Sequence, residues 1–94
     1  MNCVIYAKQN DGISVYEQYN QCAALAKRLG YSVSGKVLDF DGTKLHEAIN
    51  KVIAEHDVVA LIIYSKDVVF NDYSEWFFYR IYFDKLGKKL IIAE

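Results

Sequence analysis

The chain has 94 residues, enough for one domain; it is 53% hydrophobic and 24% charged, and its net charge is −1. This composition is globular and excludes a disordered chain, which would be poor in aromatic residues and rich in net charge. The longest apolar run, Val58–Tyr64, is far shorter than the roughly 20 residues of a spanning helix, so we expect no membrane partner.

The charge balance and the cysteine content bear on DNA binding, cellular compartment and metal binding. Eleven basic residues are matched by twelve acidic ones, and the arginines are Arg28 and Arg80. Because a DNA-binding domain usually carries a basic patch, we expect DNA binding by this chain alone to be weak or absent. Cys3 and Cys22 are expected to be reduced thiols in a cytoplasmic protein. No metal-ligand spacing occurs, so we predict neither a metal nor a cofactor.

The first unit is a strand followed by a helix. Asn2–Ala7 is predicted to be a buried strand, and a polar loop, Lys8–Ile13, follows it. Ser14 and Glu17 have the spacing of a capping box, which satisfies backbone donors at the start of a helix. Gly30 suits the end of that helix. One apolar face recurs along it at helical spacing: Val15, Tyr19, Cys22, Ala26 and Leu29.

The second unit repeats this pattern. Tyr31–Phe40 is predicted to be a strand whose inward residues are Val33, Val37 and Phe40, and Asp41–Thr43 is a turn that starts a helix. The core-facing stripe of that helix has the expected spacing: Leu45, Ala48, Ile49, Val52 and Ile53. The continuous branched run from Val58 is typical of a central parallel strand that is covered on both faces.

The last unit contains a third helix, Asp72–Leu86, which Gly87 ends, and a fourth strand, Lys88–Ala93. Alternating strands and helices predict an α/β domain with three layers and a mainly parallel four-stranded sheet. We expect the strand order 2-1-3-4 of a flavodoxin-like fold. Any site should then lie in the loops at the carboxyl ends of the strands, near the point where the strand order reverses.

These loops leave several chemistries open. The loop at Lys8 lacks the glycine-rich phosphate-binding patterns, although the helix start behind it is a generic anion site. Asp39, Asp41 and Asp67 would suit a Mg²⁺ pocket. We favour a simpler interpretation, with Asp41 as a helix cap and Asp39 as a solvent-exposed loop residue. Ser65 would be a nucleophile only beside a base, and no histidine is close in sequence.

Motifs along nearly the whole chain resemble a known family, whose members typically read YAR-x-S, then S-x-x-x-Q-x-x-x-C, then GY-x-V. Here the corresponding residues are Tyr6–Asn10, then Ser14, Gln18 and Cys22, then Gly30–Val33. Asp57–Tyr64 and Lys85–Glu94 resemble the third and fourth strands of the family. The chain thus resembles the amino-terminal catalytic domain of serine recombinases, the resolvase/invertase and large integrase family. The resemblance implies a resolvase-like fold and a link to DNA strand exchange in mobile elements.

The departures from the family bear on activity. In the family, a serine two residues after the YAR arginine attacks a DNA phosphate; the aligned residue here is Asn10, whose carboxamide cannot do so. Lys8 replaces the arginine and loses its bidentate fork. In the D-R-L-x-R stretch the acid survives as Asp67, but Val68 and Asn71 replace both arginines. Phosphoryl transfer depends on positioned cations, so the resemblance implies a catalytically silent relative. The family site positions are Lys8, Asn10, Gln18, Asp67, Val68 and Asn71.

The resemblance also sets an expectation for domain organisation. Family catalytic domains continue past the fourth strand into a long helix, and a separate DNA-binding domain follows. The present sequence stops at Glu94. We therefore expect a single resolvase-like domain over residues 1–94 that cannot recombine DNA by itself.

The third predicted helix carries aromatic residues around most of its circumference. We expect one face, with Phe77, Ile81 and Trp76, to cover the sheet. The rest would form an exposed patch, and such patches often mark partner surfaces. The predicted interface residues are Trp76, Tyr79, Tyr82 and Phe83. A second copy or a recombinase protomer is the expected partner, unless the tyrosine hydroxyls simply reach solvent from a broad core face.

Three hypotheses for function follow from these patterns. The leading one is a non-catalytic, serine-recombinase-like pseudoenzyme that acts through protein contacts, either as a regulator or with a new partner. The second is an active recombinase fragment that another chain completes, with Ser65 as the nucleophile. The third is a small ligand-binding module of flavodoxin-like fold that is unrelated to DNA.

Overall fold

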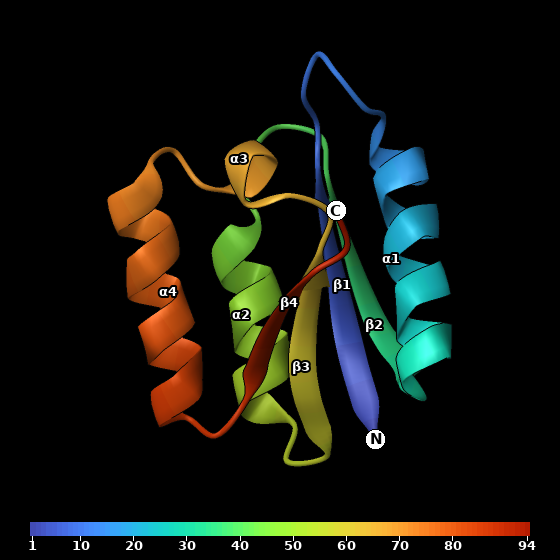
Figure 1. Cartoon of the computed structure of the whole chain (residues 1–94), viewed down its shortest axis with the longest axis vertical. Helices are drawn as coiled ribbons and strands as arrows, with labels where there is room; N and C mark the ends of the chain where they lie inside the picture. The colour runs from blue at the N-terminus through green and yellow to red at the C-terminus, as the bar shows by residue number, and fades with distance from the viewer.

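The computed structural model describes all residues, 1–94, and contains one parallel four-stranded sheet with the strand order β2-β1-β3-β4. The elements in chain order are β1 (Asn2–Lys8), α1 (Val15–Leu29), β2 (Ser32–Asp39), α2 (Leu45–Ala54), β3 (Val58–Ile63), α3 (Lys66–Val69), α4 (Tyr73–Lys85) and β4 (Lys89–Ile92). Figure 1 shows α1 beside one face of the sheet and α2 and α4 beside the other. The predicted three-layer α/β class and strand order are confirmed.

The sheet separates two hydrophobic clusters because side chains alternate along each strand. On β1, Cys3 and Ile5 pack with α1, whereas Val4 and Tyr6 pack with α2 and with Phe83 of α4. Cys3 and Cys22 are free thiols within the α1 cluster. Burial raises the pKa of the Cys22 thiol to about 12, which keeps that thiol protonated and unreactive at neutral pH.

The ends of α1 follow the sequence signals. The Ser14 hydroxyl oxygen accepts a hydrogen bond of 3.1 Å from the backbone N–H of Glu17. Gly30 has φ 81°, a left-handed conformation that glycine adopts without a steric penalty. The buried face differs from the predicted one, because Gln18 is fully buried and Leu29 is exposed.

Strand β2 is an edge strand, and this position changes which of its residues are buried. Val37 lies in the core as predicted, but Val33 and Phe40 are exposed. An edge strand has one neighbouring strand and incomplete helix cover, so its apolar pattern overstates its burial. Ile53 of α2, also predicted to face the core, is exposed as well.

Lys88, in the loop between α4 and β4, contacts the end of α2 and the start of β3. Its ammonium donates hydrogen bonds to the backbone carbonyl oxygens of Val52, Glu55 and Val58, at 2.8, 3.0 and 2.6 Å. Val52 and Glu55 belong to the end of α2, where a cation suits the negative end of the helix dipole, and Val58 is the first residue of β3. All three N–H groups of this lysine are therefore used inside the fold.

The structure contains a one-turn helix, α3, that the sequence did not predict. The Ser65 hydroxyl caps it by accepting a hydrogen bond of 3.2 Å from the backbone N–H of Asp67. Phe70 follows α3 and is buried, and its ring stacks on Tyr79 of α4 with a centroid distance of 5.5 Å. The ring centroid of Phe70 also lies 5.8 Å from that of Trp76, so Phe70 packs against the inner side of α4.

The buried and exposed faces of α4 differ from the predicted ones. Phe83 is 1% exposed and belongs to the core, so it is not a contact residue, and Trp76 and Tyr79 are partly buried against the same cluster. Phe77, which was expected to cover the sheet, is 44% exposed, and Ile81 is exposed too. A helix with aromatic residues all round has no apolar period, so its sequence alone does not define an inner face. None of the helices combines the length and apolar character that crossing a bilayer requires.

Candidate functional site

The carboxyl ends of the strands surround a hollow of about 190 Å³. It lies between β1, the loop that leads from β2 into α2, and the segment from α3 to α4. Its lining residues are Tyr6, Lys8, Gly42, Thr43, Leu45, His46, Val69, Asn71, Glu75 and Tyr79. This hollow lies at the edge of the sheet where the strand order predicts a site.

Strand alternation places Tyr6 and Lys8 on the same side of β1, so both reach this hollow. Parallel pairing sets Lys8 beside Asp39, the last residue of β2. The turn after Asp39 passes through Gly42, which has φ 78°. A non-glycine residue would be strained at this φ, and its Cβ would lie 3.6 Å from Cε of Lys8.

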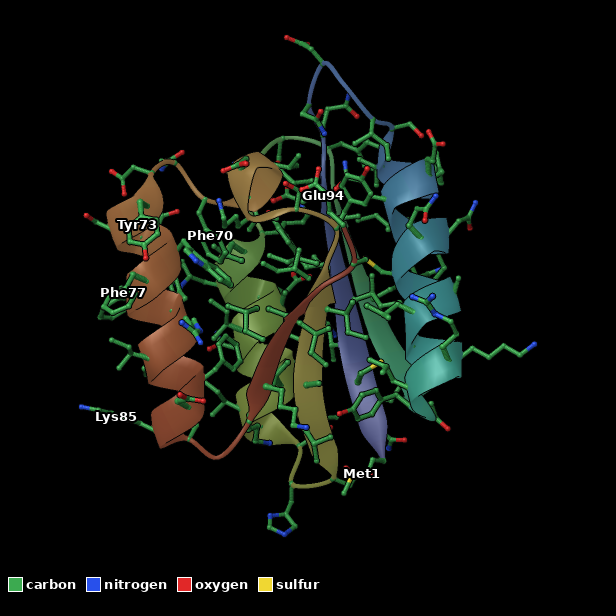
Figure 2. All side chains as sticks on the ribbon, viewed as in Figure 1. Met1, Phe70, Tyr73, Phe77, Lys85 and Glu94 are labelled. Atoms are coloured by element: carbon green, nitrogen blue, oxygen red, sulfur yellow. The ribbon has the colours of Figure 1, made fainter.

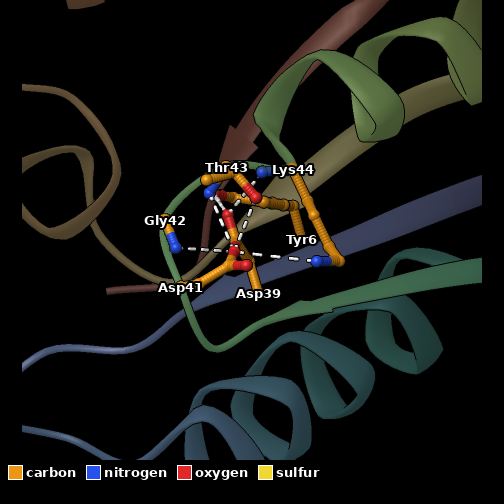
Figure 3. Close-up of polar contacts among 6 residues, drawn as sticks. All are labelled: Tyr6, Asp39, Asp41, Gly42, Thr43 and Lys44. Atoms are coloured by element: carbon orange, nitrogen blue, oxygen red, sulfur yellow. Dashed lines mark hydrogen bonds and ion pairs between the residues drawn. The ribbon is translucent and has the colours of Figure 1, made fainter.

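Asp39 is the centre of the polar contacts in this part of the molecule (Figure 3). One carboxylate oxygen accepts from the backbone N–H groups of Gly42 and Thr43, at 2.8 and 3.1 Å. The other accepts from the N–H of Lys44 at 2.9 Å and from the Tyr6 hydroxyl at 2.5 Å. Asp39 is fully buried, so the prediction that it is a solvent-exposed loop residue is wrong.

These contacts set the protonation states of Asp39 and Tyr6 at neutral pH. Burial by itself raises the pKa of the Asp39 carboxyl, but the hydrogen bonds from Tyr6, Lys44 and Gly42 outweigh burial and lower the pKa to about 2. Burial and the neighbouring carboxylate of Asp39 raise the pKa of the Tyr6 hydroxyl above its usual 10. At neutral pH the hydroxyl therefore donates to a carboxylate, and Asp39 holds the start of α2 in place.

The prediction that Asp41 caps the second helix is wrong, and Asp39 instead holds the turn that precedes α2. Helix α2 begins at Leu45, and its N-cap residue, Lys44, makes no capping hydrogen bond with its side chain. Asp41 instead accepts from the hydroxyl of Thr43 at 2.6 Å and forms an exposed ion pair with Lys44. The signal for this turn was present in the sequence, because two aspartates and a glycine within Asp39–Thr43 suit side-chain-to-backbone turn bonding.

Two carboxamides close the loop between β1 and α1. The backbone carbonyls of Lys8 and Ile13 each accept from Asn10 Nδ2, at 3.2 and 3.0 Å, and from Gln18 Nε2, at 2.6 and 3.0 Å. Gln18 Oε1 accepts from the N–H of Lys8 at 3.1 Å. Asn10 Oδ1 accepts from the N–H groups of Gly12 and Ile13, at 2.7 and 3.1 Å. The side chain of Asn10 thus makes all four hydrogen bonds that a carboxamide offers.

Solved structures with a similar fold include catalytic domains of serine recombinases and of an integrase. The catalytic domain of ISC1926 TnpA, an IS607-like serine recombinase, has a TM-score of 0.71 and 20% identity, and the match covers 100% of this chain and 70% of that one. The catalytic domain of TP901-1 integrase has a TM-score of 0.72 and 22% identity, with 99% and 77% covered. The catalytic domain of IS1535 TnpA, another IS607-like serine recombinase, has a TM-score of 0.66 and 14% identity, with 97% and 70% covered.

This chain has the fold of a serine recombinase catalytic domain. The likeness runs over the full chain and includes the order of the strands and the flanking helices. No protein-family model matches the sequence. No curated protein matches it either.

The family site positions fall into three places on this serine recombinase fold. Lys8 and Asn71 both line the hollow. Asn10 and Gln18 belong to the neighbouring loop network, where their carboxamides face backbone groups. Asp67 lies on α3 with its side chain 82% exposed, paired with Lys66 at 3.3 Å. The structure therefore brings together part of the predicted set and leaves Asp67 at the surface.

The remaining arginine positions of the family supply no cation. Val68 is partly buried on α3. Asn71 donates from its backbone N–H and its Nδ2 to the carboxylate of Glu75, at 3.2 and 3.4 Å. Arg28 lies in the last turn of α1 and Arg80 on α4, and neither lines the hollow. Lys8 and His46 are the only basic side chains among the lining residues.

The alternative sites from the sequence are not assembled in this structure. Ser65 is 3% exposed, and its hydroxyl is engaged at the start of α3. No group of three or more His, Cys, Asp or Glu residues could hold a metal ion. The hollow itself, at about 190 Å³, is smaller than the roughly 300 Å³ at which small-molecule sites begin.

Proposed function

We propose that this chain is a non-catalytic, serine-recombinase-like domain that acts through protein contacts. The observation that carries the proposal is the state of Asn10, which stands where the family has its nucleophilic serine. All hydrogen-bonding positions of its carboxamide are occupied by backbone groups of its own loop. The side chain therefore serves to hold the loop and has no free group for attack on phosphorus.

The cations around the hollow support the same proposal. The transition state of phosphoryl transfer is stabilised mainly by positioned positive charge. Of the family arginine positions, Lys8 alone retains a charge, and lysine lacks the planar fork that binds two phosphate oxygens. The carboxylate of Glu75 lies in the same hollow and opposes phosphate binding. Nucleophile and cation cluster are thus changed together.

The proposal extends to partners and location. With a net charge of −1, the chain has little electrostatic attraction for DNA, so DNA contact by the isolated chain is weak or absent. Its partner is a second copy or a protomer of a serine recombinase, whose fold it shares. Two buried free thiols suit a reducing compartment, the cytoplasm.

Covalent DNA trapping tests the catalytic part of this proposal without knowledge of a target site. An epitope-tagged chain is expressed in its host, the cells are lysed in denaturant, and purified DNA is probed for attached protein. We expect no adduct from the wild type, nor from Asn10→Ser, because one hydroxyl does not restore the cation cluster. An adduct that forms in the wild type and is lost in Ser65→Ala would establish the alternative of an active fragment.

Affinity capture tests the contact part. The tagged chain is incubated with host lysate in low and high salt, and the recovered proteins are identified by mass spectrometry. Recovery of a serine recombinase in high salt, or recovery of untagged copies of the chain itself, is the expected result. If neither is recovered and native mass spectrometry shows a bound small molecule, a ligand-binding module is the better account.

A further inference from the structure

Helix α4 presents an apolar face to solvent that nothing in the fold covers. We define its outer face by the residues that line one open groove: Tyr73, Ser74, Phe77, Phe78, Ile81, Tyr82 and Lys85. Figure 2 shows Tyr73, Phe77 and Lys85 directed away from the sheet, whereas Phe70 lies on the inner side of α4. The outer face is thus opposite the face that packs on the core.

The area of this face exceeds what isolated surface residues leave exposed. Tyr73, Phe77, Phe78, Ile81 and Tyr82 are between 37% and 68% exposed. At 150–250 Å² for a whole aromatic side chain, they leave roughly 500 Å² of mostly apolar surface. The largest patch on a typical monomer is of this size and is often functional. This apolar area is roughly two thirds of the 800 Å² that each partner contributes to a standard interface, and the polar rim of Ser74 and Lys85 adds to it.

The ridges and groove of the outer face have the shape that packs against another helix. Tyr73 and Phe77 stack with a centroid distance of 6.0 Å and form one ridge, and Phe78 and Tyr82 stack at 6.1 Å and form a second. Between the ridges lies a groove of about 510 Å³. Ridges of one helix pack into grooves of another, so a second α4 offers both the ridge and the groove that this face requires.

The charges on α4 select the direction of such a pair. Its first turn is acidic, with Asp72 as the N-cap and Glu75 behind it, and its last turn carries Lys85. An antiparallel pair sets Asp72 near Lys85 of the copy and opposes the two helix dipoles, whereas a parallel pair sets like charges together. A two-fold axis generates this antiparallel arrangement from two identical faces.

We infer that two copies of this chain associate through the outer faces of antiparallel α4 helices. The inference rests on the proposed function in that the chain acts through protein contacts, and it names the partner of that surface as a second copy. In this arrangement Phe77 faces Ile81 of the copy, and Ser74 lies near Lys85 of the copy. The hollow at the carboxyl ends of the strands stays outside the interface.

Sedimentation over a concentration series tests the association. We expect a monomer–dimer equilibrium whose dissociation constant rises on the order of 100-fold or more in Phe78→Glu, because each substitution occurs twice in a symmetric interface. Tyr73→Lys is a second variant at another point of the face. Tyr16→Glu is the matched control, since Tyr16 is an equally exposed aromatic residue on α1. A wild type that is monomeric throughout would overturn the inference, as would a dimer that neither outer-face variant weakens.

Cysteine cross-linking tests the direction of the pair. Ser74 and Lys85 are eleven residues apart, about 16 Å along one helix, so a disulfide between them must join two chains. We expect Ser74→Cys/Lys85→Cys to form a covalent dimer under mild oxidation, whereas Ser74→Cys alone should associate without a disulfide. Cross-linking of the single variant would indicate parallel helices and overturn this arrangement.

The outcomes separate this inference from the proposed function. If the chain is monomeric but captures a recombinase, and Phe78→Glu abolishes the capture, the outer face serves another partner and the second-copy inference is wrong while the proposed function stands. A covalent DNA adduct from the wild type would remove the proposed function and leave the dimer measurement unaffected.

Discussion

The carboxamide of Gln18 on α1 is fully buried and holds both ends of the loop between β1 and α1. Its Oε1 accepts from the N–H of Lys8, and its Nε2 donates to the carbonyl oxygens of Lys8 and Ile13, at 2.6 and 3.0 Å. Glutamate has the same shape but places an oxygen where the amide nitrogen was. We therefore predict that Gln18→Glu destabilises the fold strongly at neutral pH and much less in acid.

The magnitude follows from these contacts. Loss of two hydrogen bonds costs about 2 kcal/mol. The new carboxylate also faces two carbonyl oxygens in a fully buried position, which raises its pKa. Protonating a glutamate of ordinary pKa at pH 7 costs about 3.7 kcal/mol, which caps the ionisation penalty, so the total is about 3–5 kcal/mol. Because the pKa of the new carboxyl in the folded variant is raised, the variant is most stable below about pH 4, where this carboxyl is protonated. Its free energy of unfolding falls as the pH rises through that raised pKa.

Urea unfolding followed by tryptophan fluorescence and circular dichroism measures this difference. Gln21→Glu is the matched control, because Gln21 is an exposed residue on the same helix and the charge change is identical. Relative to this control, we expect the free-energy deficit of Gln18→Glu to shrink by about 2 kcal/mol between pH 7 and pH 4. Equal stability of the two variants at pH 7, or a deficit that does not change with pH, would refute the reasoning.

Other predictions address the two ends of α2. Lys88→Met should lower the free energy of unfolding by about 2 kcal/mol because three hydrogen bonds from its ammonium are lost. Lys89→Met, at an exposed position, should change it by less than about 0.5 kcal/mol in the same urea titration. The lowered pKa of Asp39 predicts that wild-type stability rises by about 2 kcal/mol from pH 2 to pH 4; acid titration of Asp39→Asn should lack this rise. The raised pKa of Tyr6 predicts a loss of stability above pH 10, absent in Tyr6→Phe.

The local features of this chain were readable from its sequence because they depend on near neighbours. The capping pair of Ser14 and Glu17, the left-handed Gly30 and the branched run of β3 are all short-range signals, and the structure has each of them. Alternation of strands and helices leaves few ways to connect a parallel sheet, so the order of the strands was also predictable. The positions of Lys8 and Asn71 at the carboxyl edge followed from that topology.

What the sequence could not determine depends on contacts between distant segments. Aspartate is a residue type typical of loops, but Asp39 is buried because the hydroxyl of Tyr6, 33 positions away, donates a hydrogen bond to it from the neighbouring strand. The inner face of α4 is defined by tertiary contacts, with Phe83 in the core and Tyr79 on Phe70, since the helix itself has no apolar period. The fold class was thus a property of the local sequence. Which polar groups are buried, and which aromatic face is left for a partner, was decided by tertiary packing.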